Sequence, residues 1–151
     1  MTARNILLFL LGSLGLGAIF GDAVLIISRY GKLFGMPLSS LRTSPFNNFL
    51  IPGIILFTVV GVIQILTMVA LIKRPVNRLA EKFNLFRHMH WAWTFSTYTV
   101  FALIIWNQVE MYFLQAVHWS HNLCMFIALS IIFMALLPQV RNLFNENLNK
   151  K

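Results

Sequence analysis

Residues 106–122, WNQVEMYFLQAVHWSHN, contain the side chains of this chain best suited to chemistry, although strongly apolar runs flank the segment on both sides. They include the carboxylate of Glu110 and the imidazoles of His118 and His121. A second carboxylate, Asp22, interrupts the first apolar run of the chain. If these runs cross a membrane, a charge at a helix centre costs about 2.5–3.5 kcal/mol, so each of these residues is a candidate for function.

The first interpretation of these residues is structural. Asp22 would accept hydrogen bonds from Asn107 or from a hydroxyl group, or would pair with Arg29. Glu110 and the two histidines would then end a helical hairpin at the membrane interface. A second interpretation is a polar pocket for a small molecule, a lipid headgroup or a proton, with Asp22 as its titratable group.

A third interpretation is a metal site. His118 and His121 are three residues apart and therefore lie on one face of a helix. Together with Glu110 and Asp22 they would form a set of nitrogen and oxygen ligands suited to zinc, copper or iron. HxxH with distant carboxylates indicates a metal site less specifically than HExxH does. We therefore predict that the protein binds no cofactor, with a metal ion as the alternative.

The composition predicts the class of protein. Of the 151 residues, 58% are hydrophobic and 11% are charged, and the mean hydropathy is +0.75, whereas about 25% of the residues of soluble domains are charged. The formal charge of +8 does not indicate nucleic-acid binding, because the basic residues lie between the apolar runs. The single cysteine, Cys124, excludes an intrachain disulfide, a CxxC redox pair and a cysteine-based zinc site. We therefore predict a polytopic membrane protein.

Four segments have the apolar character of membrane-spanning helices, which need about 20 residues: residues 5–28, 50–72, 91–110 and 118–138. The fourth has only 15 purely apolar residues, 123–137, so it must also use residues 118–122, which places the histidines at the membrane interface. The first apolar run exceeds the roughly 7–15 residues of a signal-peptide core, so we expect a retained span. The predicted fold is a single all-α domain, a bundle of four transmembrane helices over residues 1–151.

The basic residues predict the orientation of these spans. Nine of the 12 lysines and arginines lie on the side that holds both termini and the connection after the second span, and three lie on the other side. Lysine and arginine are enriched on the cytoplasmic side of membrane proteins. Both termini are therefore predicted to be cytoplasmic, in a bacterial-type inner membrane, with the segment 106–122 outside.

This orientation gathers polar residues in the outer half of the bundle. Asp22 lies seven residues before Arg29, or about 10 Å below the outer end of its span at 1.5 Å per residue. Residues at similar or slightly shallower depth on the other spans complete a polar layer. The predicted layer consists of Asp22, Thr58, Asn107, Glu110, His118 and His121, with Cys124 at the same depth as a small core residue.

The two longer connections are predicted to lie at the membrane surface. After the second span, Val76, Leu79, Ala80, Phe83 and Phe86 recur at helical spacing. The intervening basic residues, which would contact anionic lipid, are Arg78, Lys82 and Arg87. This basic amphipathic segment would serve as an interfacial connector or would dock a partner. The outer connection, residues 31–53, is broken by glycine and proline and predicts an interfacial loop.

Within that outer loop, GMPLSSL followed by SPFNNFLIPG resembles a motif of small, functionally uncharacterised four-span bacterial membrane proteins. The resemblance includes a glycine-rich first span and covers residues 5–72 best. In that group the entry to the fourth span often reads SWLQP, whereas this chain has HWSHN. The resemblance implies the four-span architecture and no particular activity, and it does not extend to the two histidines.

Small residues predict how the first two spans pack. Ser13, Gly17 and Gly21 recur every four residues on one stripe of the first span, and Gly53 and Gly61 lie eight residues apart on the second. Small residues at such spacings let helices approach closely in lipid. We expect the first two spans to form a tight pair along these stripes.

The functional prediction is a non-catalytic membrane protein, because GxSxG, P-loop and HExxH motifs are all missing from the sequence. It would bind a lipid-like or small molecule, or would be a subunit or homo-oligomer within a larger membrane assembly. One alternative is a membrane enzyme or metal-binding protein that uses Asp22, Glu110, His118 and His121. Another is a proton-coupled small transporter centred on Asp22. The sequence does not specify the ligand.

Overall fold

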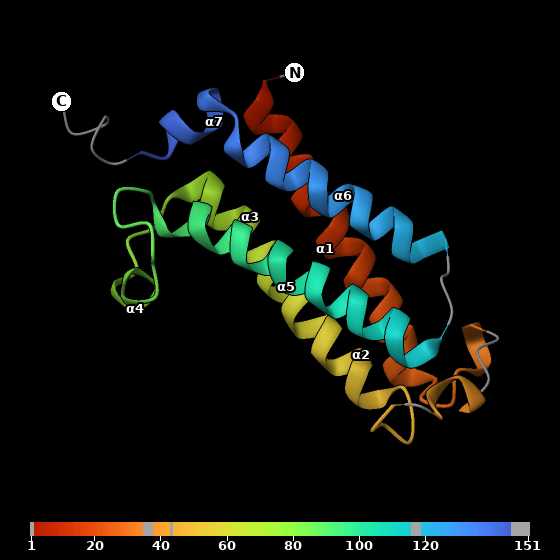
Figure 1. Ribbon diagram of the computed structural model, residues 1–151. Helices are drawn as coiled ribbons and strands as arrows, with labels where there is room; N and C mark the ends of the chain where they lie inside the picture. The colour runs from red at the N-terminus through yellow and green to blue at the C-terminus, as the bar shows by residue number, and fades with distance from the viewer. Residues whose placement is uncertain (1, 35–37, 43, 116–118, 146–151) are drawn as a thin grey trace.

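The computed structural model describes residues 2–34, 38–42, 44–115 and 119–145, and its long elements are all helical (Figure 1). The described part contains no strand, only an isolated antiparallel bridge between Met89 and Asn145. The all-α prediction is thereby confirmed. The helices are α1 (Ala3–Ile27), η1 (Lys32–Phe34), η2 (Leu38–Leu41), α2 (Leu50–Leu56), the π-helical turn η3 (Phe57–Val62), α3 (Ile63–Lys73), α4 (Arg78–Lys82), α5 (Trp91–Leu114), α6 (Trp119–Leu136) and α7 (Pro138–Leu143).

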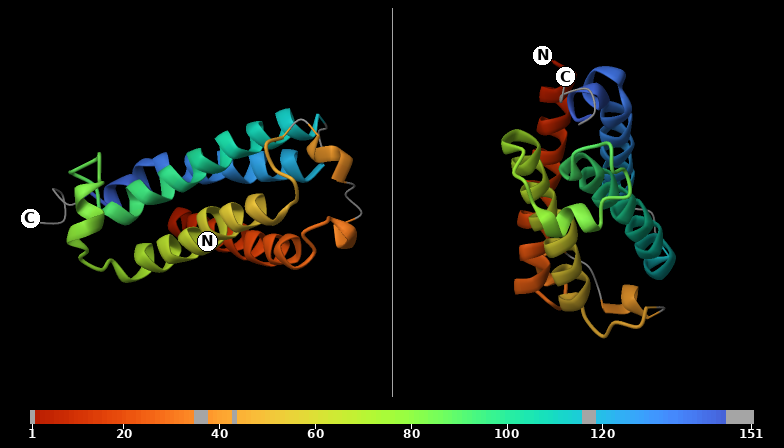
Figure 2. Two further views of the ribbon diagram at one scale, coloured as in Figure 1. Left: turned by 90° about the horizontal axis from the view of Figure 1, so that it is seen from below. Right: turned by 90° about the vertical axis from the view of Figure 1, so that its left-hand side faces the viewer.

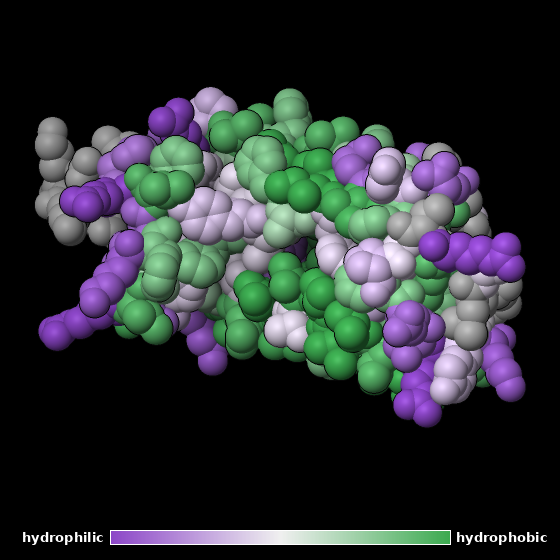
Figure 3. Space-filling model, turned by 60° about the horizontal axis from the view of Figure 1, so that its bottom comes forward, coloured by the Kyte–Doolittle hydropathy of each residue, from purple (hydrophilic) through white to green (hydrophobic). Residues whose placement is uncertain are grey.

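Three helical stretches are long and apolar enough to cross a membrane: Ala3–Ile27, Leu50–Lys73 and Trp119–Leu136. Their length and composition indicate a membrane protein, as the sequence predicts. The face in Figure 3 agrees, because a broad hydrophobic band lies between hydrophilic residues at both ends of the molecule. Helix α5 is 24 residues long but is not one of the three, because hydroxyl and amide side chains interrupt its apolar residues.

The long helices run alongside one another (Figures 1 and 2). Helix α1 packs against α2, η3, α3 and α6, and α5 packs against α3 and α6. The start of α1, the end of α3, the start of α5 and α7 lie at one end of the bundle, which we call the α7 end (Figure 1). The η1 and η2 turns lie at the opposite end, which we call the loop end.

Helix α1 and the stretch Leu50–Lys73 do form a close pair, and Gly53 and Gly61 lie in the contact as predicted. A Cβ atom on Gly61 would lie 2.8 Å from Cγ1 and 3.3 Å from the backbone nitrogen of Ile19. A Cβ atom on Gly53 would lie 3.2 Å from both Leu25 and Ile26. The two helices therefore approach at a distance that leaves no room for side chains at these positions.

The stripe predicted on α1 is wrong. Ser13 and Gly17 are exposed, and a Cβ atom on Gly17 or Gly21 would meet nothing within 4 Å. Gly12 and Gly15 are buried instead, and a Cβ atom on Gly15 would lie 2.8 Å from Cδ1 of Ile65. Because α1 is apolar on all sides, the positions of its small residues did not identify its buried face.

Helix α5 satisfies its hydroxyl groups largely within its own backbone. Ser96 and Thr97 donate hydrogen bonds to the carbonyl of Trp93, at 2.7 and 3.2 Å, and Thr99 donates to that of Phe95 at 3.1 Å. Such bonds to the preceding turn are common for hydroxyl residues in membrane helices. The indole of Trp93 donates to the carbonyl of Ala135 at 3.0 Å, which joins α5 to α6.

The connection 74–90 is less helical than its spacing predicts, because α4 has only five residues. Ala80 is buried, but Val76, Leu79, Phe83 and Phe86 are all exposed. The connection is held to α5 by side chains: Asn84 accepts a hydrogen bond from Thr94 at 2.6 Å, and Tyr98 donates to the carbonyl of Phe83 at 3.2 Å.

The glycine contacts yield a paired prediction. Gly61→Ala should lower the melting temperature in mild detergent, because its Cβ atom would press on the backbone of Ile19, and overpacking costs about 1–3 kcal/mol. Gly17→Ala should leave the melting temperature unchanged or slightly higher, because it meets open space and alanine favours helix. A larger loss for Gly17→Ala than for Gly61→Ala would contradict this packing.

Candidate functional site

A cluster of polar and ionisable side chains lies toward the loop end of the bundle, where α1, α5 and α6 each contribute a part. Helix α1 contributes Asp22. Helix α5 contributes Asn107 and Glu110, and α6 contributes His121 and Cys124. The residues on α5 and on α6 are three apart, so each pair lies on one helix face. We call these five residues the polar cluster.

Direct contacts join the α5 and α6 members of the cluster. Nε2 of His121 lies 3.7 Å from Oε2 of Glu110, an ion pair when the imidazole is protonated. Nδ2 of Asn107, a buried residue, donates a hydrogen bond to the backbone carbonyl of His121 at 3.0 Å. The two helices are thereby linked at the point where α6 begins. The sequence grouped these three residues by depth, and the structure brings them into contact.

Asp22 is buried, with 8% of its surface exposed, and its neighbours differ from those expected for a structural carboxylate. It makes no hydrogen bond and no ion pair with the described residues. Asn107 bonds to His121 instead, and Arg29 is exposed and stacks on the ring of Tyr30 at 5.1 Å. The structural interpretation of Asp22 therefore lacks the partners that it requires among the described residues.

The surroundings of Asp22 are themselves acidic. The carboxylate of Glu110 lies near enough to interact with it electrostatically, and the thiol of Cys124 lies near both carboxylates. Two of the four acidic residues of the chain therefore gather within one polar cluster. Two carboxylates repel each other in a medium of low dielectric constant when both are ionised. A group that carries positive charge or donates hydrogen bonds would relieve this repulsion.

Trp106 is a neighbour of the polar cluster that the sequence did not identify as a site residue. The indole N–H of Trp106 lies beside the Glu110 carboxylate, but it is buried and makes no hydrogen bond of ordinary geometry with the described residues. Trp106 lies one turn before Glu110 on the same helix, which was the available signal. Cys124, which was predicted at the depth of this layer as a small core residue, belongs to the cluster itself.

Two predicted members do not join the cluster. Thr58 is exposed, and its hydroxyl donates a hydrogen bond to the carbonyl of Ile54 at 2.8 Å. His118 lies outside the described residues, so its place in a metal site stays a prediction. Among the residues that the structure describes, no group of three or more histidine, cysteine or acidic side chains has a geometry that could hold a metal ion.

A further buried polar group is Gln64 on α3. Only 1% of its surface is exposed, and neither its amide nitrogen nor its amide oxygen has a hydrogen-bond partner among the described residues. A lone polar residue in a membrane span usually bonds to a neighbouring helix. Gln64 instead faces Gly15, whose Cβ position lies 3.4 Å from its own Cβ atom.

The hydrogen bond between α5 and α6 is testable by substitution. Asn107→Leu should lower the free energy of unfolding by about 0.5–1.5 kcal/mol, because it removes the bond to the carbonyl of His121. The matched control is Gln108→Leu, at the exposed position next to Asn107, which should change the free energy of unfolding little. Unfolding in mixed detergent measures both. Equal losses would show that this bond does not stabilise the hairpin.

Comparison with known proteins adds no family to this description. No protein-family model matches the chain, and neither a curated protein nor a solved structure matches it. The resemblance suggested by the loop motif therefore stays a prediction.

Proposed function

We propose that this protein is a non-catalytic, four-span membrane protein whose polar cluster binds a small polar molecule or a lipid headgroup. In this proposal α5 is the fourth span, which its length and its packing beside α3 and α6 support. At 24 residues and 1.5 Å per residue it is about 36 Å long, enough for a hydrocarbon core of about 30 Å. Both termini are cytoplasmic in an inner membrane of bacterial type, as the distribution of basic residues favours.

The observation that carries the binding proposal is that Asp22 is 8% exposed and has no hydrogen-bond or ion-pair partner among the described residues. A buried polar group that lacks a hydrogen bond costs about 1–3 kcal/mol, and a charged one costs more. The N–H of Trp106 adds an unsatisfied donor beside Glu110. A ligand with an amine or hydroxyl group would donate to the carboxylates, and an acceptor atom on it would satisfy the indole.

Native mass spectrometry of the protein, gently solubilised from its own membrane, tests this function. The wild type should carry a defined small-molecule mass. Asp22→Asn and Glu110→Gln should each reduce its occupancy at least severalfold, because each removes a charged acceptor. The matched control is Glu81→Gln, because Glu81 is an exposed acidic residue on α4 that is not part of the polar cluster.

Other outcomes of that measurement would replace the proposal. A bare wild-type mass would overturn ligand binding, and a mass that includes another protein chain would favour a subunit of a larger assembly. A stoichiometric metal that His118→Ala and His121→Ala remove would favour the metal-binding alternative. The melting temperature of each variant identifies those that fail to fold.

The orientation is tested separately by cysteine labelling in a Cys124→Ser background. Ser39→Cys and Gln115→Cys should react with a membrane-impermeant maleimide in intact cells, because both lie outside in this proposal. Arg78→Cys should react only after the membrane is disrupted. All three positions are exposed. Protection of Gln115→Cys in intact cells would contradict a spanning α5, and the reverse pattern at all three would invert the orientation.

A further inference from the structure

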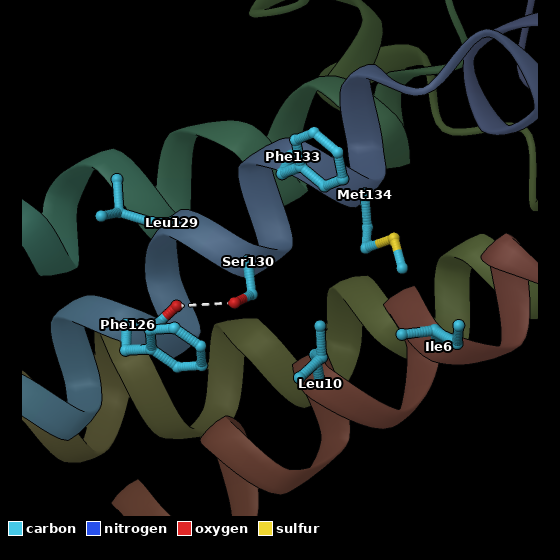
Figure 4. A pocket seen from close by; sticks show the side chains of 7 residues that line it. All are labelled: Ile6, Leu10, Phe126, Leu129, Ser130, Phe133 and Met134. Atoms are coloured by element: carbon cyan, nitrogen blue, oxygen red, sulfur yellow. Dashed lines mark hydrogen bonds between the residues drawn. The ribbon is translucent and has the colours of Figure 1, made fainter.

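Two apolar surfaces of the molecule differ in the charge that accompanies them. The first is a groove between α1 and α6 (Figure 4). Leu10, Phe126, Phe133 and four other described residues line it, and none of these seven is charged. The second surface is the connection 74–90 between α3 and α5, where apolar and basic side chains are exposed together. Of the two surfaces, only the connection carries charge that can specify what covers it.

The connection is held along one face of α5. The indole of Trp91 donates a hydrogen bond to the carbonyl of Pro75 at 2.8 Å, and the hydroxyl of Thr94 donates to Asn84 at 2.6 Å. The hydroxyl of Tyr98 bonds to the connection as well. Because Trp91, Thr94 and Tyr98 are three and four residues apart, they lie on one helix face. The connection therefore runs beside the first turns of α5, and its helix α4 lies apart from the long helices (Figure 1).

These hydrogen bonds set the depth of the connection. Tyr98 lies seven residues after Trp91, or about 10 Å along α5 at 1.5 Å per residue. Its hydroxyl donates to the carbonyl of Phe83 and accepts from the backbone N–H of Leu85, each at 3.2 Å. Interfacial segments bury their apolar side chains about 5–10 Å into the boundary between headgroups and acyl chains. Beside a spanning α5 that begins at the interface, Phe83 and Leu85 lie at this depth.

The irregular backbone of residues 83–89 has partners for several of its polar groups. The side chain of Asn84, a buried residue, donates to the carbonyl of Met89 at 2.8 Å and accepts from the backbone N–H of Phe86 at 3.1 Å. Tyr98 satisfies one backbone group on each side of Asn84. Backbone groups without partners are costly away from water. These bonds therefore suit a segment that lies in the headgroup layer.

The apolar and basic side chains of α4 form neighbouring rows. Leu79 and Phe83, the residue that caps α4, are four residues apart and are 66% and 65% exposed. Arg78 and Lys82 are also four apart and exposed. Since successive helical residues differ in direction by about 100°, this basic row adjoins the apolar row. Glu81 points to the other side of the helix from Leu79 and Phe83.

The charge of the connection favours an anionic partner. Residues 74–90 contain four arginines and lysines and one acidic residue, Glu81. Arg78, Lys82 and Arg87 are exposed and form no ion pair with a described residue. The surface that offers hydrocarbon and negative charge together is a layer of anionic lipid headgroups.

We propose that the connection 74–90 is an interfacial anchor, which inserts Leu79, Phe83 and Leu85 into the cytoplasmic side of the membrane. Arg78 and Lys82 contact the headgroups of anionic phospholipids, and the hydroxyl of Tyr98 holds the anchor at its depth. The proposal rests on the spanning α5 and the orientation of the proposed function. It does not depend on ligand binding at the polar cluster.

The experiment measures the surroundings of single side chains in vesicles. The full chain in a Cys124→Ser background carries one cysteine, labelled with an environment-sensitive fluorophore. The vesicles contain phosphatidylcholine and phosphatidylglycerol, with nitroxide groups on lipids as quenchers. A label at Leu79→Cys or Phe83→Cys should emit at a shorter wavelength than in water and should be quenched. Glu81→Cys, on the other side of α4, is the matched control and should emit as in water.

A substitution on α5 tests how the anchor is held. Tyr98→Phe removes the hydroxyl that bonds to the backbone of residues 83 and 85, so the label at Phe83→Cys should shift toward an aqueous emission. Phe83→Cys itself keeps both bonds, because they involve backbone atoms. Tyr112→Phe, at an exposed tyrosine further along α5, is the matched control and should leave the emission unchanged.

The headgroup contact is tested by charge. Quenching of the label at Phe83→Cys should increase with the fraction of phosphatidylglycerol in the vesicles. Arg78→Gln combined with Lys82→Gln should remove most of this dependence, because basic residues near the surface are attracted to anionic lipid. Lys32→Gln, at an exposed basic residue of the loop end, is the matched control and should keep the dependence.

Three results would overturn the proposal. An aqueous emission at both Phe83→Cys and Glu81→Cys would exclude an inserted anchor, and it would overturn this proposal alone where Gln115→Cys still reacts from outside in intact cells. Quenching that does not depend on phosphatidylglycerol would exclude the contact with anionic headgroups. A label at Phe83→Cys that is shielded in native membranes but aqueous in vesicles of the purified chain would assign this surface to a protein partner.

Discussion

The close approach of α1 to the helical stretch Leu50–Lys73 is the constraint on which the rest of the structure depends. Lipid offers no hydrophobic gain when helices associate, so their pairing rests on van der Waals contact at short distance. Ile19 of α1 packs against Gly61. Leu25 and Ile26, one to two turns further along α1, pack against Gly53. Asp22 lies between these contact points, which fix its depth and direction. The helix pair thus positions the acidic residue of the candidate site.

Helix α5 shows how the bundle tolerates a polar component. Its hydroxyl side chains donate hydrogen bonds to its own backbone. Trp93 and Asn107 donate to backbone carbonyls near the two ends of α6. Helices α3 and α6 cover it, and many of its polar residues are buried. Hydrogen bonds within and between helices satisfy polar groups that lipid cannot. The low hydropathy of α5 therefore fits a helix that contacts protein along much of its length.

Two of the three described carboxylates lie toward the loop end of the bundle, whereas basic residues lie at both ends. The polar cluster concentrates two carboxylates toward the loop end, whereas arginine side chains gather at the α7 end, where Arg74 also stacks on Phe144 at 4.8 Å. Burying two carboxylates in one cluster costs electrostatic free energy unless a compensating group lies beside them. Among the described residues, the polar cluster has only His121 as a contact that can become cationic. This arrangement of charge links the fold to the proposed binding at the polar cluster.

The sequence by itself determined the helical class and the apolar character of three long helices, because hydropathy and helix length are local properties. It also placed Asp22, Asn107, Glu110 and His121 at similar depth, since depth follows from the rise per residue. Only the tertiary structure decided which faces meet. Helix α1 is apolar all round, so periodicity could not distinguish its Gly12 and Gly15 face from its Gly17 face, and Thr58 turned outward for the same reason. The face that each helix buries depends on how closely it packs against the other helices. It therefore depends on the sequences of all the helices together.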